Sequence, residues 1–224
     1  MDNMDLFPLM LSFQVAFIAS IIGLIIGLPI AWLLGKSKGR WVEVVDSLLT
    51  LPMILPPTVL GYYLLVLLGR NSVIGQFFES LGLPLIFTIR GVIIAATVVS
   101  IPYFIKTART AIEGVSKDLL DVARVLGRNE VEIFFHVILP NAWRGITAGI
   151  VLMFARALGD FGTTLMVAGS IPGVTMTMPI AIYNAMLAGE QGKANTLVLI
   201  MTITAFIVLI AINLLNRKVW SDQR

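Results

Sequence analysis

The chain has 224 residues, of which 58% are hydrophobic and 13% are charged, and its formal net charge is +3. Soluble domains carry roughly 25% charged residues and at most about half apolar residues, so this composition excludes an ordinary soluble domain. It predicts an all-α integral membrane protein, with residues 1–224 forming a single domain. The small net charge gives no indication of nucleic-acid binding, and without cysteine the sequence says nothing about disulfides or thiolate metal sites.

Long runs without charged residues predict the membrane spans. A membrane helix needs about 20 mostly apolar residues. Uncharged runs predict spans at 6–35, 47–69, 88–109 and 194–216, the third of them extended because Arg90 and Lys106 can reach the membrane surface. A further span, the fourth in chain order, is predicted from about 140 to 167, although it contains Arg156 and Asp160. The segment 168–189 is also uncharged but contains glycine and proline, so we expect an outer loop with a short helix near 178–188.

The distribution of lysine and arginine predicts the orientation, because these residues concentrate in cytoplasmic segments. With five spans and an outer N-terminus, the outer segments hold only Arg70, Arg90 and Lys193. The inner segments hold Lys36, Lys38, Arg40, Lys106, Arg109, Lys117, Arg124, Arg128, Arg144, Arg217, Lys218 and Arg224. We therefore expect the C-terminus and the segment 112–140 in the cytoplasm, with Asp2 and Asp5 outside. Residues 1–30 lack a basic leader region, so no cleaved signal peptide is expected.

The first half of the segment 112–140 has the pattern of a short amphipathic helix. Ser116 is a candidate N-cap, and Gly127 stands where a helix C-cap favours the left-handed conformation. Between them one apolar stripe follows helical spacing: Leu119, Val122, Ala123 and Leu126. Such a helix fits the groove of a partner protein. The alternative is that its stripe packs on the chain's own helix ends.

A second short helix is predicted directly after Gly127. Asn129 is a candidate N-cap, and Glu132 follows three residues later, as in a capping box. Because proline breaks the interior of a helix, this helix is expected to end before Pro140. His136, the only histidine, has no second histidine or cysteine nearby and is interpreted as a loop residue.

Prolines interrupt the second predicted span, at Pro52, Pro56 and Pro57. Each removes a backbone N–H, and in a membrane such breaks are tolerated where protein or a water-filled cavity satisfies the freed carbonyls. One interpretation is that the break lines a transport path, with Thr58 as the polar residue facing it. The alternatives are a kink that serves packing, or a helix that begins at Pro57.

Two ionisable residues lie four apart in the fourth predicted span, Arg156 and Asp160. Charged residues inside a membrane usually face protein or water and are paired. They therefore form a candidate gate or orienting pair beside the path, and Phe161 and Thr163, in the Phe161–Thr164 segment, are candidate gate residues. The alternative, which we favour slightly, is a static buried ion pair at a subunit interface, because a neutralised arginine attracts anions only weakly.

Two pairs of glycines have the GxxxG spacing that permits close helix contact, Gly23/Gly27 and Gly145/Gly149. In a chain with 19 glycines they indicate helix packing and, weakly, dimerisation. The sequence contains no Walker motif and no nucleophile–base constellation, so no ATP-binding, catalytic or metal-binding residue is predicted.

The segment from Asp121 to Pro140 resembles the cytoplasmic coupling loop of ATP-binding-cassette (ABC) importer permeases. That loop reads Glu-Ala-Ala, three residues, Gly, nine residues, Ile-x-Leu-Pro. The corresponding residues of this chain are Asp121, Ala123, Gly127, Val137, Leu139 and Pro140. Val122 replaces the middle alanine and Asp121 the glutamate, with little change in size or charge sign. The resemblance implies that the contact with an ATPase falls on Asp121, Ala123, Gly127, Leu139 and Pro140.

The resemblance extends over nearly the whole chain. Residues 51–62 and 67–70 look like the second span of molybdate ABC transporter permeases, and residues 154–162 and 171–173 like their fourth span and outer loop. The family implies a type I importer permease fold in the plasma (inner) membrane, in contact with lipid. It also implies a homodimer, two cytoplasmic ATPase subunits that bind the ATP, and an extracytoplasmic molybdate-binding protein.

Other functions remain open from the sequence. Sulfate permeases share much of the pattern at 154–173, so a sulfate/thiosulfate or tungstate importer is the nearest alternative. A secondary anion transporter or channel has similar composition, but no inverted repeat is visible. An intramembrane enzyme is disfavoured, because Asp160 is the only acidic residue inside the predicted spans.

Overall fold

The computed structural model describes residues 6–37 and 39–221, with side chains as far as Ile210, and within these residues every regular element is a helix. The elements are α1 (Phe7–Lys36), α2 (Arg40–Ile54), α3 (Pro57–Leu68), α4 (Val73–Ser80), α5 (Ile89–Glu113), α6 (Lys117–Val125), α7 (Glu130–Ile133), the π-helical turn η1 (Phe134–Ile138), α8 (Leu139–Leu158), α9 (Gly162–Ala168), α10 (Met178–Leu187) and α11 (Gln191–Ser221). Of the residues used to predict orientation, Asp2, Asp5, Lys38 and Arg224 lie outside the described part, as do the side chains of Arg217 and Lys218.

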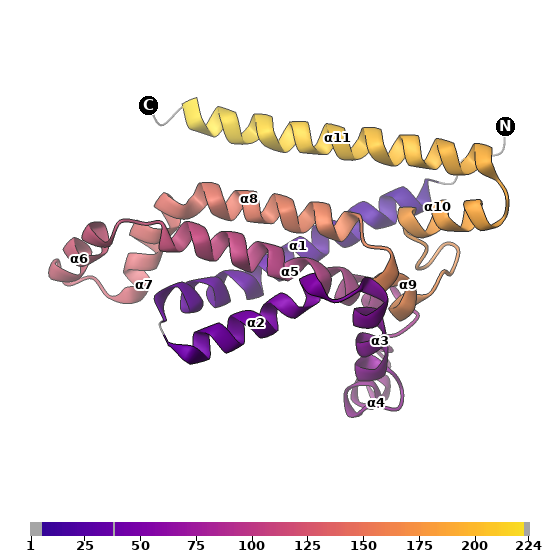
Figure 1. Cartoon of the computed structure of the whole chain (residues 1–224), viewed down its shortest axis with the longest axis horizontal. Helices are drawn as coiled ribbons and strands as arrows, with labels where there is room; N and C mark the ends of the chain where they lie inside the picture. Colours follow the sequence, from indigo (N-terminus) through magenta and orange to yellow (C-terminus); the bar gives the residue numbers. More distant parts are fainter. Residues whose placement is uncertain (1–5, 38, 222–224) are drawn as a thin grey trace.

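Four helices are long and apolar enough to cross a membrane, and a bent pair of helices counted as one span makes a fifth crossing. The four are α1, α5, the continuous helix Glu130–Leu158 and α11 as far as Ile210. The fifth is α2 with α3, which meet at a bend of 112°. In Figure 1, α1 begins and α11 ends at opposite ends of the bundle, as an odd number of crossings requires. The prediction of an all-helical membrane protein with about five spans is confirmed, as is the short helix near 178–188, observed as α10.

The bundle is built on α1, α5 and α8, which run side by side (Figure 1). Small residues allow their close approach: a Cβ at Gly27 would lie 2.7 Å from the Phe104 ring, and one at Gly149 would lie 3.1 Å from it. Gly23 faces the Met153 side chain and Gly145 faces Ala111 in the same way. All four GxxxG glycines therefore serve packing inside one chain, and they give no support to the weak dimerisation reading.

α2 is attached to this core by ion pairs and by two partly buried residues, Val42 and Leu49. It contains no fully buried residue, and its Asp46 carboxylate lies 2.7 Å from Lys106 Nζ and 3.1 Å from Arg109 Nη1, both on α5. The second span therefore begins at Arg40, before the uncharged run that marked it in the sequence. The Lys106 ammonium, which was expected to reach the membrane surface, ends on a carboxylate of the neighbouring helix.

The two ends of the bundle differ in construction. At one end, the α6 end, α6 and α7 form a helical loop between α5 and α8 (Figure 1). At the other, the α9 end, the short helices α3, α4, α9 and α10 surround the termini of α5 and α8 (Figure 1). The candidate coupling residues lie at the α6 end, and the candidate gate residues lie at the α9 end.

Candidate functional site

α6 ends in a turn that is fixed by its own backbone. Gly127 has a φ of +79°, its N–H donates to Arg124 O at 2.9 Å, and the Arg128 N–H donates to Ala123 O at 3.1 Å. This is the Schellman arrangement, and it confirms the C-cap predicted at Gly127. Ser116 is at the N-cap position, as predicted, although its side chain makes no capping hydrogen bond.

The following helix begins with the predicted capping box. Asn129 Oδ1 accepts a hydrogen bond from the Glu132 N–H at 2.9 Å, and Glu132 Oε2 accepts one from the Asn129 N–H at 3.1 Å. Together with the Schellman turn, these two hydrogen bonds fix the direction in which α7 follows α6. The shape of the loop is thus determined by local hydrogen bonds.

α6 exposes most of its apolar residues. Leu119 is 48% exposed, Val122 58%, Leu126 75% and Val125, which the predicted stripe did not include, 88%. Ala123, by contrast, is only 7% exposed and belongs to the chain's own core. The predicted stripe is therefore divided: Ala123 packs inward, and the other residues form an uncovered apolar face.

The helix that begins at Glu130 does not end before Pro140, so that expectation was wrong. α7, η1 and α8 form one continuous span, and Pro140 lies in the first turn of α8. The π-helical turn η1 widens the helix just before the proline. This makes room for the proline ring and accommodates the hydrogen bond lost with its N–H. The Asn141 side chain also donates to the Val137 carbonyl at 2.7 Å.

The residues assigned to coupling by resemblance fall into two sets in the structure. Asp121, Gly127 and Pro140 are exposed, whereas Ala123 and Leu139 pack against the same core cluster. Ala123 and Leu139 thus hold the loop on the bundle. Of the assigned coupling residues, those that remain accessible are Asp121, Gly127 and Pro140.

The fourth span was expected to reach Val167, and this was also wrong, because α8 ends at Leu158 and a separate helix, α9, follows. Asp160 explains the break. Its Oδ2 accepts hydrogen bonds from the Thr164 N–H at 3.0 Å and from the Thr164 hydroxyl at 2.8 Å. A carboxylate that caps the next helix in this way competes with continuation of the first.

Asp160 is paired with Arg156. Arg156 Nη1 lies 3.3 Å from Asp160 Oδ1, and the Asp160 side chain is 1% exposed while that of Arg156 is 26% exposed. The carboxylate therefore has a cation on one oxygen and two donors on the other. This geometry fits the static buried ion pair that the sequence slightly favoured over a gate or an orienting pair, while the gate itself stays a prediction.

The two helix breaks meet at the α9 end. The Thr163 hydroxyl donates to the Pro57 carbonyl at 3.2 Å, and a Cβ at Gly162 would lie 3.0 Å from Pro57 Cβ. One turn further along α3, a Cβ at Gly61 would lie only 2.6 Å from Met166 Cβ on α9. The structure thus brings together candidate gate residues from the second and fourth spans, with exposed Pro56 and Thr58 beside them.

α9 packs on α3 and α5, and the residues that flank it contact α10. The rings of Phe161 and Tyr183 have centroids 5.0 Å apart, and Asn184 Nδ2 donates to Ser170 Oγ at 2.7 Å. Thr163 and Thr164 are 0% and 1% exposed. α9 is therefore enclosed by its neighbours.

Sequence reasoning missed a strained residue next to α9. Phe87 has a φ of +55°, which is unusual for a bulky residue. Its N–H donates to the Val167 carbonyl at 3.1 Å, and its ring lies against Gly169, where a Cβ would be 3.2 Å away. These contacts hold Phe87 in its strained conformation, and they attach the segment that precedes α5 to the end of α9. No sequence pattern marks Phe87, because the strain arises from contacts about 80 residues away along the chain.

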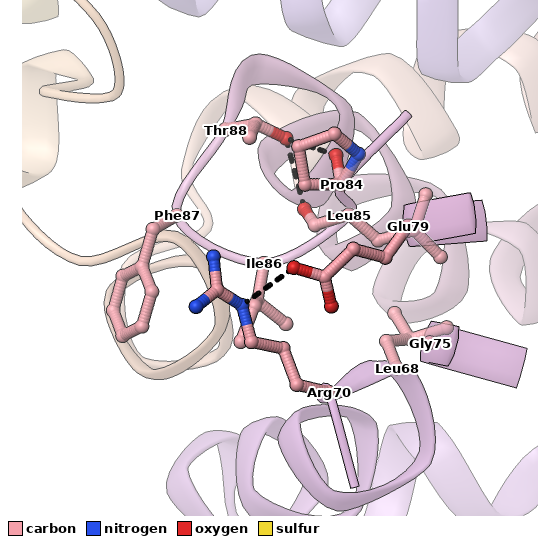
Figure 2. Close-up of a pocket in the computed structure, with 9 residues that line it drawn as sticks. All are labelled: Leu68, Arg70, Gly75, Glu79, Pro84, Leu85, Ile86, Phe87 and Thr88. Atoms are coloured by element: carbon pink, nitrogen blue, oxygen red, sulfur yellow. Dashed lines mark hydrogen bonds and ion pairs between the residues drawn. The ribbon is translucent and has the colours of Figure 1, made fainter. Parts of the chain in front are cut away.

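A pocket of about 410 Å³ lies at the same end, between α3, α4 and the residues before α5. Figure 2 shows Arg70 and Glu79 reaching toward one another across it, with the Arg70 Nε 3.0 Å from the Glu79 Oε1. Because the arginine is already paired with a carboxylate, this pocket presents no free cation to an anion. In the part of the chain that the structure describes, no group of three histidine, aspartate or glutamate residues is placed to hold a metal ion.

The fold and the two sites define a class of protein. Several long apolar helices, one of them sharply broken, with helix breaks packed together inside the bundle, are typical of membrane transport proteins. Residues 23–221 match the family described as binding-protein-dependent transport system inner membrane component. The chain belongs to this family.

Curated relatives and a solved structure agree with this assignment. The chain is 38% identical to the molybdenum transport system permease protein ModB of Escherichia coli (strain K12), over 90% of each protein. It is 35% identical to the ModB protein of Azotobacter vinelandii, over 93% of this chain and 92% of the relative. Its fold is similar to a chain of the inward-facing MetNI methionine ABC transporter, with a TM-score of 0.77 at 17% identity, over 95% of this chain and 94% of that chain.

Proposed function

We propose that this chain is the permease subunit of an ATP-driven importer that carries molybdate into the cytoplasm. The observation that carries the proposal is the uncovered apolar face of α6, formed by Leu119, Val122, Val125 and Leu126. An amphipathic helix with such a face fits a hydrophobic groove on a partner protein. Molybdate is supported by two relatives named as molybdenum transport permeases, at 38% and 35% identity.

The proposed partner of α6 is a cytoplasmic ATPase subunit, which supplies the ATP-binding motif that the sequence of this chain does not contain. The basic residues of the sequence favour the α6 end as the cytoplasmic side, the N-terminus outside and the C-terminus inside. Two copies of the chain would then present two α6 helices to two ATPase subunits. An extracytoplasmic molybdate-binding protein would deliver the anion at the α9 end.

The proposed movement links the two ends of the molecule. Closing of the ATPase pair on ATP draws the two α6 helices together, and each rigid bundle follows as a body. At the α9 end, the docked helix breaks of α3 and α9 are the elements that separate or close around the path. Pro57 and Thr163 are in direct contact there, and Phe161 packs beside them.

Weak binding of the anion along the path suits this arrangement. A transport site has to release what it admits. The guanidinium of Arg156 is largely committed to Asp160, at 3.3 Å, so it attracts a dianion less than a free arginine does. In the proposed mechanism, tight recognition of molybdate therefore belongs to the binding protein, and the permease provides passage.

The test is uptake of labelled molybdate in cells that lack their own importer, with the chain co-expressed with its ATPase and binding protein. Uptake that requires ATP and resists excess sulfate is the expected result. Tungstate is a second competitor, because it is a tetrahedral dianion of nearly the same size. ATP-dependent uptake that sulfate abolishes would identify a sulfate-type permease, and uptake without ATP would contradict the ABC mechanism.

A further inference from the structure

Glu130 lies where three elements of the α6 end converge. It is the first residue of the continuous helix Glu130–Leu158. One carboxylate oxygen, Oε1, lies 3.1 Å from Arg124 Nε in the last turn of α6, and the other, Oε2, lies 3.0 Å from Nζ of Lys36, the last residue of α1. A single side chain thus joins α6 to two membrane-spanning helices.

Few other contacts hold α6 to the bundle. Ala123 is its only buried residue, and Leu120 packs partly against the same core. A cavity of about 590 Å³ separates α6 from the ends of α1, α2 and α5, and Lys36, Arg124 and Glu130 are among the residues that line it. On this side of α6, the two ion pairs of Glu130 therefore bridge the gap to α1.

The charges of this cluster are ordered around Arg124. Its guanidinium also lies 2.9 Å from the Asp121 carboxylate, one turn earlier on α6. Hydrogen bonding to Glu130, and then to Asp121, raises the pKa of Arg124. If the Glu130 carboxylate is removed, Arg124 retains a partner within its own helix, so α6 stays intact but loses its connection to the spans.

We propose that Glu130 is a positioning residue that transmits the displacement of α6 to α1 and to the α7–α8 span at the same time. The inference rests on the proposed function, in which the ATPase moves α6. The three side chains are between 38% and 48% exposed, and partly exposed ion pairs contribute little to folding stability. Loss of Glu130 should therefore change transmission between the ends more than it changes the fold.

Glu130→Gln is the informative substitution. It preserves size but leaves one acceptor oxygen and one NH₂ group, and the NH₂ group has to face the cation of either Lys36 or Arg124. One of the two connections is therefore lost. Glu130→Asp keeps the charge at the start of the helix and should restore part of the effect.

The experiment uses the complete importer, with ATPase and binding protein, reconstituted in proteoliposomes, and measures molybdate uptake and ATP hydrolysis in parallel. We expect Glu130→Gln to lower the number of molybdate ions imported per ATP hydrolysed about tenfold, a usual size for a coupling effect. Subunit assembly and ATP hydrolysis without binding protein should remain at wild-type levels. Glu43→Gln is the matched control, because Glu43 lines the same cavity but makes no ion pair among the described residues.

The outcomes separate the inference from the function on which it rests. If the wild-type complex shows no ATP-dependent molybdate uptake, the proposed function fails. If it does, and Glu130→Gln keeps the wild-type ratio of uptake to hydrolysis, the inference alone is wrong. A proportional fall in assembly, hydrolysis and uptake would also overturn it, because Glu130 would then serve only to hold the structure together.

Discussion

The α6 end and the α9 end solve opposite structural problems. At the α9 end the Thr163 hydroxyl bonds to the Pro57 carbonyl, 106 positions away along the chain, and the strained Phe87 is held by Val167 and Gly169. At the α6 end a nine-residue helix has one buried residue and is shaped by hydrogen bonds within its own turns. The α9 end therefore depends on contacts between distant segments, whereas the turn between α6 and α7 depends on local sequence. Substitutions should show this difference.

The largest expected effect on function is at Gly127. Proline there is incompatible with the φ of +79° and removes the N–H that donates to Arg124 O, so Gly127→Pro should abolish molybdate uptake. The spans lie outside this turn, so the amount of protein in the membrane should stay normal. Gly127→Asn is the control, since asparagine tolerates the left-handed region. Uptake that survives the proline would show that the loop does not couple.

At the α9 end the largest effect should come from Arg156→Ala, which leaves the Asp160 carboxylate without its cation. Breaking a buried ion pair in this way costs about 3–5 kcal/mol. Thermal unfolding of the purified permease in detergent measures the loss. The double substitution with Asp160→Asn should recover much of it, because the remaining oxygen still accepts from Thr164. Equal losses in the single and double variants would contradict a structural pair.

A smaller loss is expected where α3 and α9 touch. Gly61→Ala places a Cβ 2.6 Å from Met166 Cβ, which should cost about 1–3 kcal/mol through overpacking and should slow uptake. Gly192→Ala is the matched control, because a Cβ at Gly192 has no atom within 4 Å. Unfolding temperature and initial uptake rate, measured together, test the packing of the two breaks. Equal behaviour of the two variants would contradict it.

The smallest effect should be at Asn129, whose side chain caps α7. Asn129→Ala removes one hydrogen bond of the capping box and should cost about 1 kcal/mol. Amide hydrogen exchange should accelerate in residues 117–133 and remain unchanged at the α9 end. Asn129→Ser keeps a capping oxygen and serves as the control. Faster exchange across the whole bundle would show that the α6 end is not locally determined.

The features that the sequence predicted well depend on neighbouring residues. Uncharged runs located most of the spans, the prolines located the break between α2 and α3, and Gly127 and Asn129 located the turn between α6 and α7. Each of these sequence features lies within one helical turn of the structural feature that it predicts. The family resemblance added the expected fold, which the structure shares with a solved importer chain at a TM-score of 0.77.

The features that the sequence did not predict depend on distant residues or on an uncommon local geometry. Asp46 pairs with Lys106 and Arg109, some 60 positions away, and this places α2 earlier than its uncharged run suggested. The π-helical turn allows the helix to continue through Pro140, although proline usually ends one. For the candidate site, the gate residues were found in the right regions, but their contact across α3 and α9 required the structure.

The capped turn at Gly127 and Asn129 has a consequence for assembly. α6 and its exposed residues already have a fixed conformation in the free chain, so the helix is preorganised for a binding groove. Docking to a partner then loses little conformational entropy, in contrast to a loop that has to fold as it binds. Association with the proposed ATPase should accordingly be a rigid-body encounter, whose rate is limited by diffusion and orientation.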